Sequence, residues 1–161
     1  DDVEGEHGDD VRDRWEKEYD AIMEETRLLP GAKDLLAGLR ARGVDVALAS
    51  SAIPKHAEYA FGLLDADDLA DTATTSEDAE ESKPDPELVT KALDRLGSDA
   101  GCVVGDSVWD VEAAKGAGVP AYGVLTGGTS RAELEEAGAV AVYRDAAELL
   151  ERLSEWVPED H

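Results

Sequence analysis

The sequence predicts an α/β fold in three layers, with a parallel sheet between two layers of helices. Two observations predict it. Short apolar runs bounded by turn residues alternate with segments in which apolar side chains recur at helical spacing. Strands separated by helices of roughly 10 to 15 residues pair in parallel, with helices on both faces of the sheet. The 161 residues, 42% of them hydrophobic, suffice for one core.

The N-terminal part is expected to form a frayed start and two helices. Residues 1–10 are mostly Asp, Glu and Gly, which favour solvent over packing. Over residues 11–28 apolar side chains recur at helical spacing, and Pro30-Gly31 breaks this helix. A second helix with leucines on one face follows, and Gly43 ends it.

The rest of the chain is expected to alternate between strands and helices. Each predicted strand is a short apolar or β-branched run, and each predicted helix repeats its apolar side chains every three or four residues. In chain order, the strands are 44–49, 72–75, 101–105, 119–124 and 140–143, and the helices are 55–64, one ending near 96, 109–117, 131–137 and one ending at 156. An acidic loop at 76–82 separates the second strand from its helix.

The charge of the chain limits its partners. Thirty-nine acidic against fifteen basic residues give a formal net charge of −24, spread along the whole chain. Such a chain repels nucleic acid and anionic membranes, because broad phosphate binding needs clustered Lys and Arg. An acidic surface for a basic partner and adaptation to high salt both explain the charge. We favour a salt-adapted cytoplasm, because the chain has only six Lys, one Phe and no Asn or Gln.

The sequence carries no membrane or disulfide signal. No stretch approaches the roughly 20 apolar residues of a membrane span, and no signal peptide is visible. We therefore expect a soluble cytoplasmic protein. Cys102 is the only cysteine, so no intramolecular disulfide can form, and its apolar neighbours predict a small buried core residue.

Chemically useful side chains follow two of the predicted strands. Ser50 and Ser51 come directly after the first strand, and Asp106 and Asp110 come directly after the third. Lys83 opens the segment that leads to the third strand. In parallel sheets, ligands bind at the carboxyl ends of the strands. Carboxylates suit Mg²⁺, and hydroxyl and ammonium groups suit phosphate, so we expect a magnesium and phosphate site there.

The two carboxylates also have a simpler explanation. Asp106 can cap the following helix and Asp110 can be a surface acid in its first turn, where negative charge is favourable. Gly105 permits a sharp turn that places Asp106 at the strand tip, but the pair alone does not decide between the two interpretations.

The order of three motifs resembles the haloacid dehalogenase-like (HAD) superfamily. Residues 46–51 end in Ser-Ser, residues 82–86 read Ser-Lys-Pro-Asp-Pro, and residues 103–110 hold both Asp residues. They match, in order and spacing, the second, third and fourth motifs of that family. The similarity covers about residues 29–156 and is typical of phosphoglycolate phosphatase-like and β-phosphoglucomutase-like members.

The resemblance implies a three-layer Rossmann-like core and a role for each motif residue. Ser50 would donate a hydrogen bond to a phosphate oxygen, helped by the backbone N–H of Ser51. Lys83 would pair with the phosphate and offset charge on the nucleophilic carboxylate. Asp106 would ligate Mg²⁺ directly, and Asp110 would support a metal-bound water or orient Lys83. Together these groups would stabilise the charged transition state of phosphoryl transfer.

The first motif of the family is absent from this sequence. It is an Asp-x-Asp after an apolar strand, whose first Asp forms the aspartyl-phosphate and whose second is the general acid and base. Residues 1–3 follow no strand, and the acidic run 65–68 follows a helix. In the family this strand lies between the strands at 44–49 and 101–105, so its absence leaves two strand edges unpaired.

Most of the cap domain of the family is also missing. Helix 11–28 resembles only the last cap helix, so we assign 1–28 to an acidic start with a residual cap helix and 29–161 to the core domain. We favour a truncated or misannotated gene as the explanation. A chain completed by a separate fragment and an enzyme-dead remnant are the alternatives.

The sequence therefore predicts a Mg²⁺-dependent phosphatase that acts on a small phosphorylated metabolite and is present without its nucleophilic Asp. A phosphomutase of the same fold and a non-catalytic phosphate-binding remnant are alternatives. A 2-haloacid dehalogenase fits less well, because Gly105-Asp106 suits metal-dependent phosphate chemistry. Among lesser features, we expect Lys55 and His56 on a solvated helix, Trp109 in a packing role and Gly127-Gly128 in a plain turn.

Overall fold

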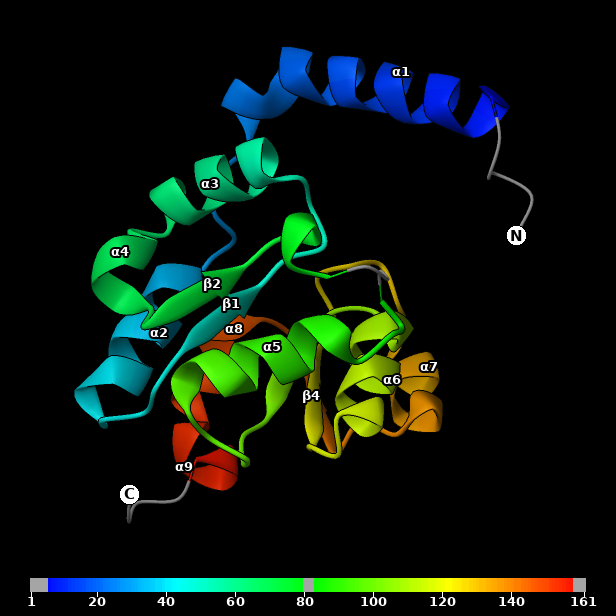
Figure 1. The fold of residues 1–161 in the computed structure, drawn as a ribbon. Helices are drawn as coiled ribbons and strands as arrows, with labels where there is room; N and C mark the ends of the chain where they lie inside the picture. Colours follow the sequence, from blue (N-terminus) through cyan, green and yellow to red (C-terminus); the bar gives the residue numbers. More distant parts are fainter. Residues whose placement is uncertain (1–5, 80–82, 158–161) are drawn as a thin grey trace.

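The computed structural model describes residues 6–79 and 83–157 as two parallel sheets between layers of helices (Figure 1). In the first sheet β1 (Ala47–Ala49) pairs with β2 (Thr72–Thr74). The second sheet has the order β3 (Val103–Gly105), β4 (Ala121–Val124) and β5 (Ala141–Tyr143). All three strand pairings are parallel. The predicted α/β fold with parallel sheets is therefore confirmed.

Both sheets share one core on the face that is covered by α2 (Ala32–Ala41), α8 (Ala146–Glu151) and α9 (Leu153–Trp156). Leu35, Leu149 and Trp156 from these helices pack with Val46 beside β1 and with Tyr143 of β5 in one buried cluster. The two sheets therefore belong to one layer of a single domain, although no strand of the described residues joins them.

The opposite face of the sheets is covered by α5 (Glu87–Leu96), α6 (Val108–Gly116) and α7 (Arg131–Ala137). Val89, Val111 and Leu134 come from these three helices and pack with Ala121 and Val142 of the second sheet. Helix α5 also contacts β1 and β2. The alternation of apolar side chains along the strands and helices thus produces the three layers that the sequence predicts.

Strands β1 and β3 each have an edge without a partner strand in the part of the chain that the structure describes. Val46 O accepts a hydrogen bond from Asp71 N (2.8 Å), and Ser50 N donates to Thr74 O (3.0 Å), both toward β2. Because backbone groups alternate in direction along a strand, those of Ala47 and Ala49 point away from β2. Likewise Val103 N donates to Pro120 O (2.9 Å), so the backbone groups of Val104 point away from β4.

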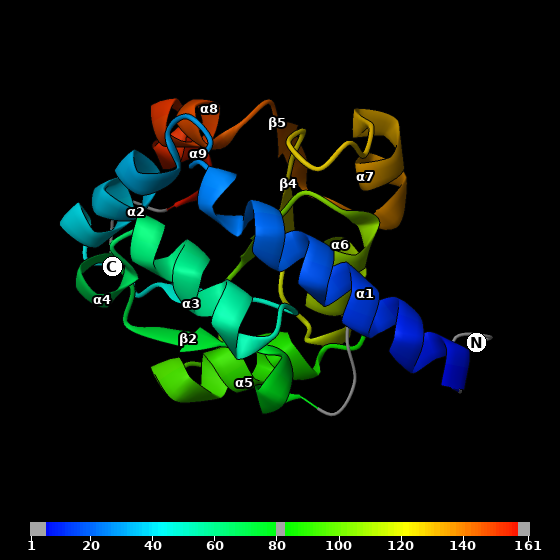
Figure 2. The same ribbon diagram turned by 90° about the horizontal axis from the view of Figure 1, so that it is seen from above.

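Helix α1 (Glu6–Ile22) lies over α3 (Pro54–Leu63), as Figure 2 shows from above. Asp20 holds it there, because its carboxylate contacts Lys55 Nζ at 2.5 Å and His56 Nε2 at 2.8 Å. The rings of Trp15 and Tyr19 lie against the His56 imidazole. His56 is only 3% exposed, so the expectation of a solvated position was wrong for His56, because α1 covers it.

Several boundaries differ from the predictions. Helix α1 begins at Glu6, inside the segment expected to be frayed, and ends at Ile22, where the 3-10 turn η1 (Met23–Glu25) replaces the predicted last turn. The short helix α4 (Ala66–Leu69) and the 3-10 turn η2 (Ser76–Asp78) were not predicted, because elements of three or four residues leave no periodic pattern. Residues 80–82 of the predicted acidic loop lie outside the described residues.

Two side chains that were expected to pack against neighbours are exposed. Cys102 lies just before the paired part of β3 and is exposed, not buried. Trp109 is 52% exposed in the first turn of α6, so it does not have the predicted packing role.

None of the described helices is both long and apolar enough to cross a membrane.

Candidate active site

Lys83 joins the ends of the two sheets. Its Nζ atom lies 2.6 Å from Asp110 Oδ1, beyond the end of β3, and 3.4 Å from the carbonyl oxygen of Ala49, the last residue of β1. The Lys83 side chain is 19% exposed, so its ammonium is largely shielded but still reached by solvent. One cation therefore lies at the carboxyl ends of both sheets, where parallel sheets bind ligands.

Asp110 uses both of its carboxylate oxygens. Oδ1 contacts Lys83, and Oδ2 accepts hydrogen bonds from Ser107 Oγ (2.7 Å) and Ser107 N (3.1 Å). Ser107 Oγ accepts in turn from Asp110 N (3.3 Å), which completes a capping box at the start of α6. The helix cap is thus Ser107, and the simpler explanation of Asp106 as the cap does not apply.

The electrostatic setting keeps Asp110 ionised. Burial by itself would raise the pKa of this carboxyl group. The positive charge of Lys83 and the hydrogen bonds from Lys83 and Ser107 outweigh burial, so the pKa of Asp110 lies below its ordinary value. At neutral pH, Lys83 and Asp110 therefore form an ion pair that fixes the position of the ammonium.

Gly105 makes room for Asp110. A Cβ atom at position 105 would overlap Asp110 Cβ and lie 2.6 Å from Asp110 Cγ. Only glycine lets the first turn of α6 pack so closely against the end of β3. The glycine that the sequence singles out for a turn therefore serves chiefly to place the Asp110 carboxylate next to Lys83.

Asp106 is held by the loop that follows β4. Thr126 Oγ1 donates a hydrogen bond of 3.3 Å to Asp106 Oδ2. A Cβ atom on Gly127 would lie 2.6 Å from Asp106 Cγ and 2.8 Å from its carbonyl oxygen, so the Gly127 backbone packs directly on Asp106. Sequence reasoning missed Thr126 and treated Gly127 as a plain turn. Their position at the carboxyl end of β4 is the signal that points to them.

Ser50 and Ser51 follow β1 as predicted. Ser50 Oγ accepts a hydrogen bond from Ala52 N (3.1 Å), which orders the turn into α3. Ser51 is exposed, and Ser50 is directly bonded to Ala49, whose carbonyl contacts Lys83. Within the described residues no hydrogen bond or ion pair connects Asp106 with Lys83 or Ser50, so the site consists of two groups of side chains on adjacent sheet ends.

Asp106 is the carboxylate of this site that a metal ion could use. No group of three or more His, Cys, Asp and Glu side chains within residues 6–79 and 83–157 is placed to hold a metal ion. Mg²⁺, however, commonly takes one or two protein carboxylates and completes its octahedron with water and substrate phosphate. Among the described residues, Asp106 Oδ1 makes no hydrogen bond, whereas both oxygens of Asp110 are already engaged.

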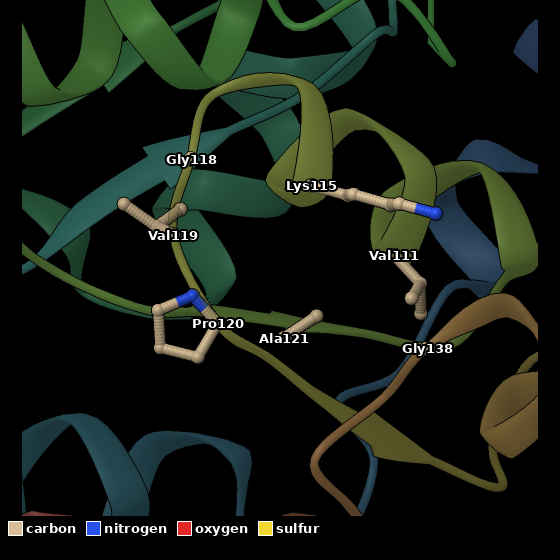
Figure 3. Close-up of a pocket in the computed structure, with 7 residues that line it drawn as sticks. All are labelled: Val111, Lys115, Gly118, Val119, Pro120, Ala121 and Gly138. Atoms are coloured by element: carbon tan, nitrogen blue, oxygen red, sulfur yellow. The ribbon is translucent and has the colours of Figure 1, made fainter.

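A shallow hollow elsewhere does not coincide with these groups. Figure 3 shows it between the start of β4 and the body of α6; it is lined by Val111, Lys115, Gly118, Val119, Pro120, Ala121 and Gly138. It lies at the amino end of β4, whereas Lys83, Asp106 and Asp110 lie at the carboxyl ends of the strands. It is therefore not part of the candidate site.

Comparison with known proteins identifies relatives of the chain. A profile of the haloacid dehalogenase-like hydrolases matches residues 1–118. A phosphoglycolate phosphatase from Rhodospirillum rubrum is 38% identical over 125 residues, covering 74% of this chain and 50% of the relative. The chain therefore spans about half the length of that relative.

Solved structures agree with the sequence comparison. A hydrolase from Pseudomonas syringae superposes with a TM-score of 0.86 at 31% identity, covering 93% of this chain and 73% of that protein. A β-phosphoglucomutase-like protein from Thermotoga maritima superposes with a TM-score of 0.79 at 30% identity, covering 91% of this chain and 69% of that protein.

Proposed function

Because the chain belongs to the haloacid dehalogenase-like hydrolases, a family of enzymes, we propose that it supplies the phosphate- and metal-binding part of a magnesium-dependent phosphatase. The substrate is a small phosphorylated metabolite. The observation that carries the proposal is the Lys83–Asp110 ion pair at the carboxyl ends of both sheets, beside Ser50 and Asp106. Phosphatases among its relatives support the reaction type.

The phosphate is bound by donors from the end of β1 and by Lys83. The Ser50 hydroxyl and the Ser51 backbone N–H donate hydrogen bonds to its oxygens, and the Lys83 ammonium pairs with its negative charge. Asp110 holds this ammonium in place through their ion pair, so Asp110 is a positioning residue. Fixed positive groups of this kind stabilise the charge that develops during phosphoryl transfer.

A magnesium ion is held by Asp106 in this proposal. When bound, it supplies positive charge that stabilises the phosphoryl group in the transition state. Asp106 would hold the ion from this part of the chain, and Thr126 donates a hydrogen bond to its Oδ2. Water, the substrate and the first motif of the family would supply the other ligands.

The nucleophilic carboxylate is supplied by a strand that is not among the described residues. The sequence has no apolar strand that ends in Asp-x-Asp. The open edges of β1 and β3, on either side of Lys83, support a position between the two sheets. Val104 has an apolar side chain that is 39% exposed on such an edge, which also supports a missing neighbour.

Hydrolysis of an aryl phosphate with Mg²⁺ in high salt tests the proposal. The 161-residue chain is compared with a version that carries an added N-terminal apolar strand ending in Asp-x-Asp. We expect activity only in the extended version, and loss of that activity in Asp106→Ala and Lys83→Ala variants. Robust hydrolysis by the 161-residue chain would contradict the missing nucleophile, and inactivity of both versions would favour a non-catalytic phosphate-binding remnant.

A phosphomutase is the second candidate. The likeness to the β-phosphoglucomutase-like protein from Thermotoga maritima favours it. The same extended version distinguishes the two reactions. Release of inorganic phosphate from a sugar phosphate indicates a phosphatase, and conversion to an isomeric sugar phosphate without release indicates a mutase.

We place this enzyme in a salt-adapted cytoplasm. The formal net charge of −24 supports this part of the proposal, because dissolved salt screens the repulsion among the acidic side chains.

A further inference from the structure

We propose that Asp78, Lys91 and Arg95 are positioning residues for Lys83. They tie the chain before Lys83 to the helix that follows it, so that this lysine is held from both sides. The inference deepens the proposed function and rests on it, because it takes Lys83 as the phosphate-binding cation and assigns control of its position to three side chains outside the site.

The chain after Lys83 is anchored by packing. It leads directly into α5, in which Leu88 and Val89 are buried and which contacts both β1 and β2. Pro86, just before this helix, packs against α6 so closely that a Cβ atom on Gly116 would lie 3.1 Å from Pro86 Cγ. Close packing of this kind fixes the start of α5 relative to the sheets.

The chain on the other side of the lysine is anchored through Asp78, the last residue of η2. Asp78 Oδ1 accepts a hydrogen bond from Arg95 Nη2, and Oδ2 accepts one from Thr75 N at 2.8 Å. The carbonyl oxygen of Asp78 accepts a third from Lys91 Nζ. Arg95 Nη1 also donates to the carbonyl oxygen of Ala73 in β2. Two cationic side chains of α5 therefore hold the turn that follows β2.

Asp78 keeps its charge in this setting. The hydrogen bonds from the Thr75 backbone N–H and from the Arg95 side chain lower the pKa of Asp78 below its ordinary value of 3.8, although burial acts in the opposite direction. The carboxylate is therefore ionised at neutral pH. An isolated ion pair at a surface contributes little, but several charges in one connected network contribute more. Here one carboxylate, two cations and two backbone carbonyl groups are connected.

The sequence places these cations on one side of α5. Glu87, Lys91 and Arg95 follow one another at intervals of four residues, so they share one face of the helix. Glu87 Oε1 lies 2.7 Å from Lys91 Nζ and adds a second acidic partner for this lysine. The chain has only fifteen basic residues against thirty-nine acidic ones. Two of these scarce cations nevertheless converge on η2, from which the chain runs to Lys83.

The contacts close the chain from Asp78 to Lys91 into a loop, and Lys83 lies within it. A closed loop has fewer conformations than a segment that is tethered at one end. The closure therefore reduces the conformational freedom that Lys83 loses when its Nζ atom contacts Asp110 Oδ1 (2.6 Å) and the carbonyl oxygen of Ala49 (3.4 Å). A group that is held in place before its ligand arrives binds that ligand more tightly.

Competitive acetylation of the lysines in the folded 161-residue chain, followed by mass spectrometry, tests the inference. The Lys83 side chain is only 19% exposed, so it should react slowly. We expect Arg95→Met to raise the acetylation rate of Lys83 by about three- to tenfold, the scale of one or two hydrogen bonds, because the released side chain is more accessible to the reagent. Lys115, which is exposed on α6, is the internal reference.

Arg131→Met is the matched control. Like Arg95, Arg131 donates to the carbonyl oxygen of a strand, at Val142 in β5, and pairs with a carboxylate, at Glu135 (3.8 Å). Its replacement removes the same kinds of contact from α7 and should leave the acetylation of Lys83 unchanged. A rise of the same size in Arg131→Met as in Arg95→Met would indicate general loosening of the fold and would overturn the inference.

Asp78→Ala tests the same network from its other side. It should also raise the acetylation rate of Lys83. Because Asp78 and Arg95 act through one set of contacts, the double variant should show clearly less than the product of the two single effects. Independent, multiplied effects would contradict a shared network. Thermal unfolding verifies that each variant is folded at the temperature of the acetylation reaction.

The inference and the proposed function fail in different ways. Unchanged acetylation of Lys83 in folded Arg95→Met and Asp78→Ala would overturn the inference and leave the proposed function standing. Calorimetric titration with inorganic phosphate measures the proposed function, and absence of binding that depends on Lys83 would contradict it. In that case, faster acetylation of Lys83 in Arg95→Met would still support the positioning. Where phosphate does bind, Arg95→Met should weaken that binding.

Discussion

Single side chains at the candidate site are held by more contacts than their sequence positions indicate. Lys83 contacts both sheet ends, and Asp110 is engaged through each of its oxygens. Such mutual support means that removal of one partner leaves another buried polar group without compensation, which costs more than the pair itself contributes. Substitutions at these positions should therefore affect folding as well as ligand binding.

Lys83→Met should destabilise the fold by about 1–3 kcal/mol. Asp110, which is only 8% exposed, would remain buried but would lose the cation that pairs with its charge. Urea unfolding at neutral pH measures this loss. Lys115→Met is the control: Lys115 is an exposed lysine on α6 with no described ion pair, and its replacement should change the free energy of unfolding little. Equal stability of both variants would show that Asp110 does not depend on Lys83.

Gly105→Ala should also destabilise the protein, by about 1–3 kcal/mol, because its Cβ atom overlaps the Asp110 side chain. The displaced carboxylate should then release Lys83, which weakens phosphate binding. Gly62→Ala in α3 is a matched control, since nothing lies within 4 Å of a Cβ atom there. It should leave stability unchanged or raise it slightly, because alanine favours a helix. The same unfolding assay compares the two variants.

At the scale of secondary-structure elements, the attachment of α1 depends on one carboxylate. Asp20 contacts both Lys55 and His56 in the first turn of α3, directly after the segment that holds Ser50 and Ser51. The aromatic rings of Trp15 and Tyr19 add to this contact. Helix α1 thus contacts α3 just after Ser50 and Ser51, which we propose bind phosphate, and a change in its attachment should be detectable there.

The attachment of α1 should weaken in acid. Hydrogen bonds from Lys55 and His56 hold the pKa of Asp20 below its ordinary value of 3.8. A carboxyl group with a lowered pKa in the folded state contributes its full stability above 3.8 and loses it as the pH falls through the folded-state value. NMR signals of Tyr19 and His56 should therefore report release of α1 below pH 3.8, and at every pH in Asp20→Asn. Signals of Asp20→Asn that match those of the original chain would contradict this role.

At the scale of the whole molecule, the two sheets form one layer without a described strand between them. The shared core under α2, α8 and α9 holds the two sheets together, and Lys83 contacts the carboxyl ends of both. The profile match and the solved structures confirm the family that three sequence motifs indicate. The roles of Ser50, Ser51, Lys83, Asp106 and Asp110 stay predictions.

Stability should rise with salt, because the net charge of −24 makes the folded chain repel itself. The Debye length falls from about 10 Å at 0.1 M to about 3 Å at 1 M, so most of this repulsion is screened over that range. Thermal unfolding in increasing sodium chloride should show a melting temperature that increases steeply to about 1 M. A melting temperature independent of salt would favour an acidic surface for a basic partner instead.

The sequence by itself determined the alternation of strands and helices, the family, and the placement of Ser50 and Asp106 directly after strands. These features are local, because the periodicity of apolar side chains fixes which face of an element is buried, and parallel strands bring their carboxyl ends to one edge. The same reasoning could not place strand ends to within two or three residues, because pairing partners decide where a ladder stops.

Only the tertiary structure decided which groups meet at that edge. The contacts of Lys83 with Asp110, of Thr126 with Asp106, and of His56 with Asp20 join residues that are distant in the sequence. They depend on how closely α6 packs on β3 and how α1 lies on α3, and periodicity carries no information about such distances. The burial of His56, the engagement of both Asp110 oxygens and the approach of Gly127 to Asp106 all follow from that packing.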